Sequence, residues 1–210
     1  MVLQRESMSD RIKQYLLERI VDGTYQPGDR LIELQIAKEL NTSQAPVREA
    51  LRELEAMRLV ECEAYRGTRV REISSRELRE SYEVRGELES FAASASAPYF
   101  KQDAQKLLQI HKEFIAAVAV KNHDFSKFSR INSQFHRLIV ETADNTVLLR
   151  VWDSLGFETW TRVNLRAVQP QSFDSNKVVQ EHQKIVDALI AGDGDKAGEL
   201  LRQHALNALS

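Results

Sequence analysis

The chain has 210 residues, 42% of them apolar and 29% charged, a balance typical of a soluble globular protein with one large or two small domains. It contains no apolar run of about 18 residues that could span a bilayer, and its N-terminus lacks the basic-then-apolar order of a secretory signal. The single cysteine, Cys62, excludes an internal disulfide framework and suits the cytoplasm, where we expect the protein to reside. A net charge of −2 gives no general support for nucleic-acid binding, so DNA affinity would depend on locally placed arginines.

The first part of the chain alternates short helical patterns with turn signals. Apolar residues at helical spacing predict a helix over residues 9–21 and a shorter one over about 33–40, separated by the turn-rich segment 22–29. Asn41 follows at the bend, because asparagine tolerates the left-handed backbone that a tight turn between helices commonly requires. The spacing of these elements is typical of the first half of a helix-turn-helix.

The next predicted helix, over about 44–57, is amphipathic. Ser43 is a good N-cap for it, because its hydroxyl can accept a hydrogen bond from an otherwise unpaired amide of the first turn. The face opposite the apolar stripe presents Gln44, Arg48 and Arg52. A helix of this kind can enter a DNA major groove, although an ordinary surface helix is the alternative.

Beyond this helix the periodicity changes to two. Alternating apolar and polar residues over 59–63 and 68–73 predict a two-stranded hairpin with a glycine turn, which completes a winged helix-turn-helix. Arg66 and Gly67 lie at the tip of this wing. Glycine permits close approach of the backbone to DNA, and arginine can reach phosphate or the minor groove.

The recognition-helix sequence Pro46-Val47-Arg48-Glu49-Ala50-Leu51, with Pro27-Gly28 before it, resembles the DNA-binding domain of the GntR family over roughly residues 12–73. Two glycines usual in that family are replaced here by Asn41 and Arg58. If the backbone at Arg58 is left-handed, it carries a strain of about 1 kcal/mol.

This resemblance implies DNA contacts from Ser43, Gln44 and Arg48 on the recognition helix and from Gly67 on the wing. It also implies a homodimer that binds a palindromic DNA operator. Family members usually carry Arg-Thr where this chain has Gln44-Ala45. Because glutamine reads adenine edges better than guanine, we expect a changed operator preference rather than lost binding.

From residue 74 onward the pattern is helical only, so we expect domains at 1–73 and 74–210 and a mainly α fold. Pro98 is expected to end the first helix of the second domain or to lie just beyond it. Together the helices would form an all-α bundle of six or seven helices, large enough to enclose a pocket. The pattern predicts helices over about 76–97, 102–120, 125–142, 146–168, 172–191 and 195–209.

Four polar residues of this bundle form a second constellation. Asn132 and His136 are separated by four residues and therefore project from one helix face. His182 and His204 belong to the last two predicted helices. A lone histidine such as His111 is usually a satisfied core or surface residue, but three on helices packed into one bundle can hold a transition metal.

The segments 83–89, 132–136 and 181–182 resemble motifs of the FCD domain, which follows the winged helix in the FadR branch of the GntR family. The resemblance implies an effector-binding bundle in which Asn132, His136, His182 and His204 surround a divalent metal, often zinc or nickel. The family usually has aspartate at the first of these positions. Because an amide brings no negative charge, we expect weaker metal binding and a stronger preference for an anionic effector such as a carboxylate.

Arg85 is expected near the pocket as a partner for an effector carboxylate, because guanidinium binds carboxylates through a bidentate fork. Pairing with Glu89 on the same helix is an equal alternative. The leading hypothesis is a transcription regulator whose operator affinity is changed by a small organic acid bound at the metal-centred pocket. The alternatives are a helical-bundle metalloenzyme with an appended DNA-binding domain, for which we see no convincing general base, and a winged-helix interaction module with a structural metal.

Overall fold

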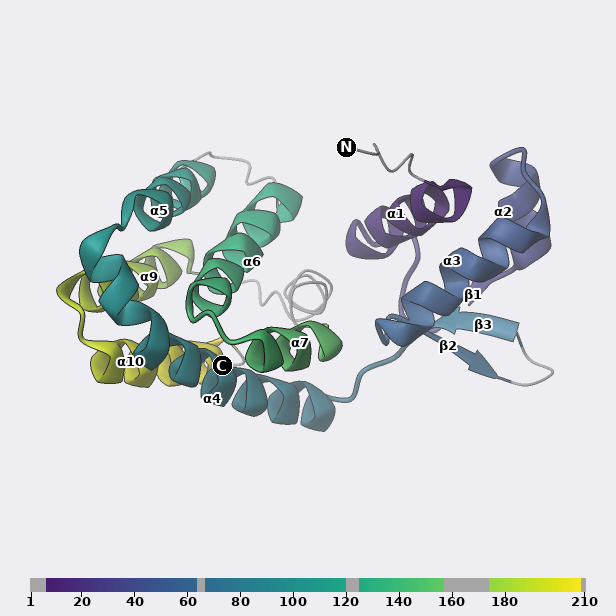
Figure 1. The fold of residues 1–210 in the computed structure, drawn as a ribbon. Coiled ribbons are helices and arrows are strands. Elements are labelled where there is room, and N and C mark those ends of the chain that lie inside the picture. Colours follow the sequence, from purple (N-terminus) through teal and green to yellow (C-terminus); the bar gives the residue numbers. More distant parts are fainter. Residues whose placement is uncertain (1–6, 64–66, 120–124, 157–173, 209–210) are drawn as a thin grey trace, which may run out of the picture. The chain divides into compact units, whose positions relative to one another are not determined.

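The computed structural model describes residues 7–63, 67–119, 125–156 and 174–208. The chain divides into two compact units, Met1–Ile73 and Ser74–Ser210. Figure 1 shows that the first unit combines helices with a small sheet, whereas the described elements of the second are all helices. None of the described helices combines the length and the apolar character needed to cross a membrane.

The first unit is a winged helix-turn-helix, as predicted. Its strands form an antiparallel sheet in the order β1-β3-β2. The two-residue strand β1 was not predicted, because so short a strand leaves no alternation in the sequence. The elements are α1 (Met8–Val21), β1 (Arg30–Leu31), α2 (Glu33–Glu39), α3 (Gln44–Ala56), β2 (Val60–Glu63) and β3 (Gly67–Val70).

The core of the first unit is organised by α3, which buries Val47, Ala50, Leu51 and Leu54 along one stripe. This spacing turns the helix's apolar face toward α1, which it packs against, and leaves the other face exposed. The turns on either side have the left-handed backbone that the sequence suggested, with a φ of 50° at Asn41 before α3 and 58° at Arg58 after it.

Ser43 is the N-cap of α3, with an extended backbone (φ −84°, ψ 165°). Its hydroxyl, however, makes no capping hydrogen bond to the described residues, contrary to our expectation. Pro46 occupies the third helical position and has no amide hydrogen, so one of the two amides that usually donate to an N-cap side chain is absent. At the start of α1, by contrast, the Ser7 hydroxyl accepts a hydrogen bond from the Asp10 amide in a complete capping box.

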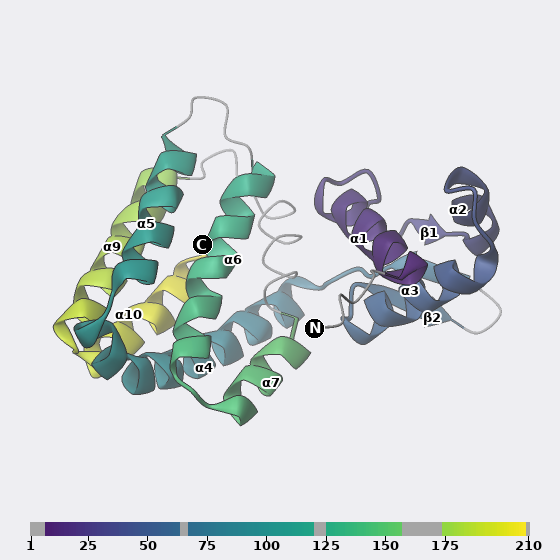
Figure 2. The same cartoon turned by 45° about the horizontal axis from the view of Figure 1, so that its top comes forward.

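The described residues of the second unit form a helical bundle, as predicted. The expected continuous helix over 146–168 was wrong, because the helix ends at Ser154 and a turn follows at Leu155 and Gly156, where φ is 63°. The rest of that prediction, 157–168, lies outside the described residues. Figure 2 shows α5, α6 and α9 lying side by side. The helices are α4 (Ser75–Gln102), α5 (Gln105–Val118), α6 (Phe125–Thr142), α7 (Thr146–Ser154), α9 (Ser175–Ala191) and α10 (Gly194–Asn207).

Helix α4 continues through Pro98 to Gln102, so the expectation that Pro98 would end it was wrong. A proline inside a helix removes a backbone hydrogen bond and destabilises it by about 3 kcal/mol. Here the proline ring is exposed, while Ala97 and Phe100 on either side are buried in the core. Burial of this last turn offsets the missing hydrogen bond.

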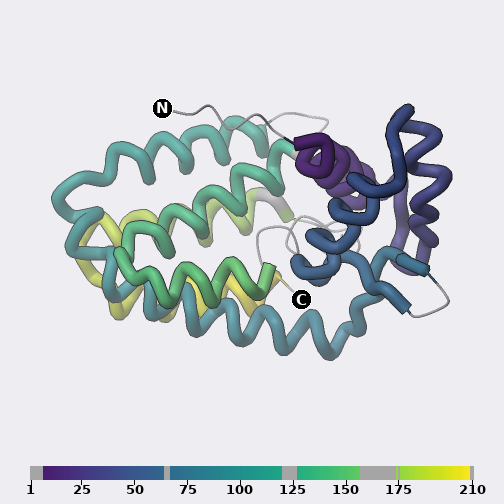
Figure 3. Tube along the Cα trace, turned by 45° about the vertical axis from the view of Figure 1, so that its right-hand side comes forward, coloured from purple at the N-terminus to yellow at the C-terminus, as the bar shows by residue number. Residues whose placement is uncertain are grey.

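Helices α4 and α10 pack closely along their length (Figure 3). Glycines make this possible: a Cβ at Gly194 would lie 2.7 Å from Ser94 Cα, and one at Gly198 would lie 2.4 Å from Ser90 Oγ. The close approach places α10 next to α4, and both helices contribute residues to the core that includes Phe135.

Candidate functional site

Three buried histidines from three helices meet in the second unit: His136 of α6, His182 of α9 and His204 of α10. One possible ligand nitrogen from each lies within 4.8 Å of the other two. The Phe135 ring stacks on the His182 ring, with centroids 4.4 Å apart, and fixes its plane. The three predicted histidines are therefore brought together in one buried cluster.

Carboxylates orient two of these rings. His136 Nδ1 lies 2.8 Å from Glu89 Oε2, and His204 Nδ1 lies 2.7 Å from Glu181 Oε2. Because an ionised carboxylate can only accept hydrogen bonds, each Nδ1 carries a hydrogen and each Nε2 keeps a lone pair when the ring is neutral. Nε2 is the nitrogen that each ring can offer to a cation.

The Nε2 atom of His136 is buried and has no hydrogen-bond partner within the described part of the chain. His204 Nε2 lies 3.2 Å from His182 Nε2, so these two nitrogens share one hydrogen. A buried nitrogen without a partner is unfavourable, because it has lost its hydrogen bonds to water and gained none in the protein. A bound cation would provide the missing partner. The donor set therefore fits a late first-row divalent metal.

The electrostatics keep the cluster in the form that binds metal. Burial lowers the pKa of His136 to about 4, although Glu89 partly opposes this effect. Burial also lowers the pKa of His182 well below its usual value, and His204 and His136 lower it further. Both rings are therefore neutral near pH 7, which is the charge state in which an imidazole binds a metal.

Asn132, the fourth predicted metal ligand, is buried on α6 one turn before His136. Residues four apart lie on the same helix face, so its amide belongs to the side of α6 that carries the cluster. Its side chain is neutral. As metal ligands, three imidazoles and this amide bring no formal charge to the ion.

Arg85 of α4 is buried, and its Nε donates a hydrogen bond to Glu89 Oε1 at 2.7 Å. Arg85 therefore pairs with Glu89, which was one of the two alternatives from the sequence. Burial raises the pKa of Glu89, but Arg85 and His136 outweigh that effect and hold it at about 2. Glu89 also lies 3.4 Å from the indole nitrogen of Trp152, so one carboxylate joins an arginine, a histidine and a tryptophan.

The predicted DNA-binding residues of α3 are all exposed: Ser43, Gln44, Arg48 and Arg52. Arg48 is held by a carboxylate of α2, because its Nε and Nη2 lie 3.1 Å and 2.8 Å from Glu33 Oε1 and Oε2. Sequence reasoning missed this partner, since a separation of 15 residues across a turn leaves no periodic signal. The guanidinium remains at the surface, with 54% of the side chain exposed.

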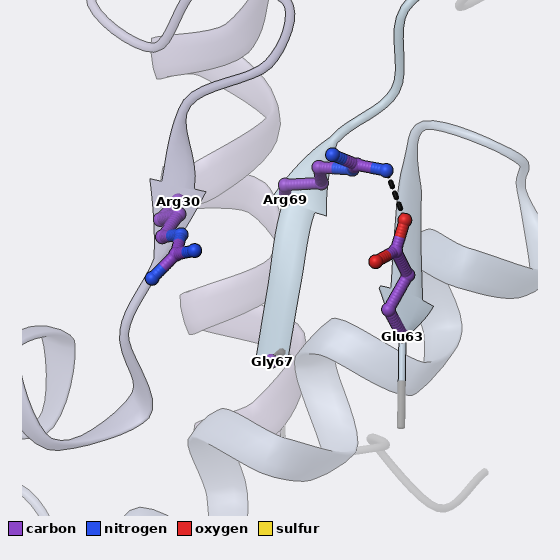
Figure 4. A pocket seen from close by; sticks show the side chains of 4 residues that line it. All are labelled: Arg30, Glu63, Gly67 and Arg69. Carbon is purple, nitrogen blue, oxygen red and sulfur yellow. Dashed lines mark hydrogen bonds and ion pairs between the residues drawn. The ribbon is translucent and has the colours of Figure 1, made fainter. Parts of the chain in front are cut away.

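On the wing, Gly67 has a φ of 84°, which favours glycine, and no described heavy atom lies within 4 Å of the place where a Cβ would be. Arg66 lies outside the described residues. Figure 4 shows a small pocket beside Gly67, with Arg30 of β1 on one side and Arg69 and Glu63 on the other. Arg30 pairs in register with Arg69 and was missed because β1 was not predicted.

Arg69 is also held by acidic neighbours. Its Nε lies 2.7 Å from Glu61 Oε1, and its Nη2 pairs with Glu63. These carboxylates relieve the repulsion between cross-strand arginines, because like charges directly opposite each other destabilise a sheet. Exposed Arg48 on α3 and half-buried Arg69 on the wing therefore both have glutamate partners.

Comparisons with known proteins agree with this architecture. The family model "Bacterial regulatory proteins, gntR family" matches residues 8–70, and the FCD domain model matches residues 80–207. A probable D-xylose utilization operon transcriptional repressor of Paenarthrobacter nicotinovorans is 34% identical over 203 residues, covering 96% of this chain and 87% of the relative. The gluconate operon transcriptional repressor of Bacillus licheniformis is 27% identical over 209 residues, covering 96% and 84%.

The fold also matches a solved structure of a GntR transcriptional regulator from Rhodococcus sp. RHA1. The TM-score is 0.82 at 25% sequence identity, and the match covers 97% of this chain and 96% of that one. The winged helix-turn-helix, the helical bundle and both family models lead to one assignment. The chain belongs to the GntR family of bacterial regulatory proteins and carries an FCD domain after its DNA-binding domain.

Proposed function

We propose that the protein is a repressor whose affinity for operator DNA is changed by a small organic acid bound at a metal in the FCD domain. The observation that carries this proposal is the buried histidine cluster with the unpartnered Nε2 of His136. Unpartnered buried atoms also occur outside the cluster, at His111 Nδ1 and Ser129 Oγ, so the convergence of three ligand nitrogens within 4.8 Å carries the greater weight. A cluster of neutral imidazoles with a free nitrogen is suited to a cation.

His136, His182 and His204 would hold the metal, and the amide oxygen of Asn132 is the candidate fourth ligand. Imidazole and amide donors suit zinc or nickel among the late first-row ions. When bound, the metal supplies a positive, Lewis-acidic centre that can attract an oxygen of the effector. The chain's own residues then keep the imidazoles neutral and oriented.

The neutral donor set favours an anionic effector, because the charge of the ion is left uncompensated in a buried site. Arg85 is proposed as a second cationic group for the effector carboxylate, and it is joined to His136 through Glu89. The relative from Bacillus licheniformis is named for a gluconate operon, and gluconate is a sugar acid. We therefore propose sugar acids as the effector class to test first.

DNA recognition is proposed to use a homodimer on a palindromic operator, with Ser43, Gln44, Arg48 and Arg52 of α3 entering the major groove. The wing would add contacts from its tip, at Arg66 and Gly67. The effector changes operator affinity if it binds more tightly to one arrangement of the DNA-binding domains than to the other. The relatives compared above are named as transcriptional repressors, which favours a regulator over the metalloenzyme alternative.

The first experiment is elemental analysis of the purified protein, followed by thermal-shift assays with gluconate, xylonate and D-xylose before and after chelation. We expect a stoichiometric metal and stabilisation by a sugar acid that disappears on chelation. Stabilisation by a sugar acid that survives chelation would mean that Arg85 binds the acid without the metal. Stabilisation by D-xylose but by neither acid would contradict the proposal that the effector is a carboxylate. An effector found in this way must also release operator DNA, or the regulatory proposal fails.

A matched pair of histidine variants tests the metal cluster itself. His204→Gln removes a cluster nitrogen and should abolish stoichiometric metal. His111→Gln changes a histidine that is also buried but whose Nε2 lies 2.9 Å from Gln183 Oε1, outside the cluster. It should retain the metal, and equal metal content in the two variants would contradict the assignment.

For DNA, Arg48→Ala is compared with Arg76→Ala, which removes the same charge from an exposed arginine of α4 that pairs with Glu80. Binding to an operator selected from random duplexes is measured by fluorescence anisotropy at several salt concentrations. Arg48→Ala should weaken operator binding at least tenfold, as expected for a lost base or phosphate contact. Equal affinity of the two variants would remove Arg48 from the interface.

A further inference from the structure

Two glutamates outside the candidate ligand set each bind the far side of a cluster histidine. Glu89 Oε2 lies 2.8 Å from His136 Nδ1, and Glu181 Oε2 lies 2.7 Å from His204 Nδ1. The third ring, His182, is placed differently, because it stacks on Phe135 and its Nδ1 has no hydrogen-bond partner among the described residues. Two of the three cluster histidines are thus hydrogen-bonded to a carboxylate.

Both carboxylates are themselves fixed. Glu89 accepts hydrogen bonds from Arg85 at 2.7 Å and from Trp152 at 3.4 Å. The second oxygen of Glu181, Oε1, accepts a hydrogen bond from Asn207 Nδ2 at 2.9 Å. A carboxylate whose two oxygens both accept hydrogen bonds is held in place, so it can fix the ring plane of the histidine it contacts.

The two glutamates differ in the charge that they leave available. Glu89 is paired with the buried guanidinium of Arg85, so much of its negative charge is already compensated. Glu181 accepts a hydrogen bond from a neutral amide, that of Asn207. Its side chain is 17% exposed, so water screens it only in part. Lys177 also attracts Glu181 electrostatically, but Glu181 is not paired with a buried guanidinium as Glu89 is, so more of its negative charge is left for the donor set.

We infer that Glu89 and Glu181 are positioning residues of the metal centre, and that Glu181 supplies, through His204, the negative charge that Asn132 does not bring. This inference rests on the proposed metal site. A carboxylate hydrogen-bonded to a ligand imidazole makes that imidazole a stronger donor, and loss of such a partner typically lowers metal affinity 10–100-fold. The compensating negative charge would then belong to a residue that is hydrogen-bonded to a metal ligand, and not to a ligand itself.

The test separates charge from orientation by using two substitutions of one residue. Glu181→Gln keeps an oxygen that can accept the hydrogen bond from His204 but removes the charge, and Glu181→Ala removes both. The control is Glu199→Gln, on the same helix as His204, whose carboxylate pairs with the exposed Lys196. Metal-free full-length proteins are titrated with zinc or nickel by calorimetry, and their thermal midpoints are measured without metal.

We expect Glu181→Gln to bind the metal at least tenfold more weakly than the native chain, Glu181→Ala to bind it more weakly still, and Glu199→Gln to bind it normally. The cobalt absorption spectrum should keep its shape in Glu181→Gln, because the ligand atoms are unchanged. A purely structural role would instead lower the metal-free thermal midpoint and leave the affinity as it was.

Native affinity in Glu181→Gln with a loss only in Glu181→Ala would overturn the charge assignment. Native affinity in both variants would overturn the positioning role as well. These results differ from failure of the proposed function, in which the native chain itself binds no zinc or nickel.

Discussion

Gly194 lies at the start of α10, directly against the backbone of α4, and we expect that it cannot be replaced by alanine without loss of stability. The added methyl carbon would lie 2.7 Å from Ser94 Cα and 3.1 Å from the Ser94 carbonyl oxygen. Carbon atoms in favourable contact lie about 3.5–4.0 Å apart, so α10 must move away from α4 by roughly 1 Å. Both neighbouring atoms are backbone, and no side-chain rotation relieves the clash.

The size of the effect follows from this displacement. A gap of about 0.5–1 Å forfeits a quarter to a half of the dispersion energy of the contacts it opens, and overpacking of this kind typically destabilises by about 1–3 kcal/mol. Alanine's greater helix propensity returns at most about 1 kcal/mol. We therefore expect Gly194→Ala to lower the free energy of unfolding of the FCD domain by about 1–2 kcal/mol.

Urea denaturation followed by tryptophan fluorescence measures this loss, because both tryptophans of the chain, Trp152 and Trp160, belong to the FCD domain. The matched control is Gly86→Ala on α4. Its methyl would lie 3.3 Å from Arg202 Cα and 3.4 Å from Ala205 Cβ, which a shift of a few tenths of an ångström accommodates. If Gly194→Ala is as stable as Gly86→Ala, the close-packing reasoning is refuted.

Three further predictions concern the cluster and one strained turn. Asn132→Asp should raise the affinity for zinc or nickel, because it adds a negative charge to a neutral donor set; equal affinities in calorimetric titrations would contradict this. In the chelated protein, the pKa of His136 is about 4, against 6.5 for an ordinary histidine. The unfolded chain therefore binds more protons between these values, and urea denaturation should show stability falling by up to roughly 3 kcal/mol as the pH drops from 6.5 to 4. Arg58→Gly should stabilise the winged helix by up to about 1 kcal/mol, because φ is 58° there; circular dichroism melts showing a loss would count against backbone strain.

The features that sequence reasoning predicted well are those encoded locally. The apolar spacing of α3 alone predicts which of its faces is buried, and Asn41 alone suggests the left-handed turn before it. The histidine cluster was also accessible, because Asn132 and His136 share a helix face and the two remaining histidines lie on helices that must pack into the same bundle.

The features that were missed depend on tertiary contacts. Pro98 was expected to stop α4, but burial of Phe100 in the next turn outweighs the lost hydrogen bond. The contacts of Glu33 with Arg48 and of Glu181 with His204 were not predicted, since the partners lie on other helices at separations that no period predicts. These two carboxylates were therefore harder to predict than Glu89, whose pairing with Arg85 on the same helix was one of the alternatives from the sequence.

The ion pair between Arg48 and Glu33 has a consequence for how the protein would search DNA. In the proposed complex, Arg48 approaches the duplex with an internal counter-ion already attached, so long-range attraction to the phosphates of random sequence is weakened. Added salt loosens this pair at the same time as it screens Arg48 from phosphate, and the two effects oppose each other. Occupancy of the operator should therefore respond less steeply to ionic strength than the number of arginines on α3 and the wing suggests. A nearly neutral DNA-binding domain should therefore bind random DNA weakly, so that a larger share of its operator affinity depends on contacts specific to the operator.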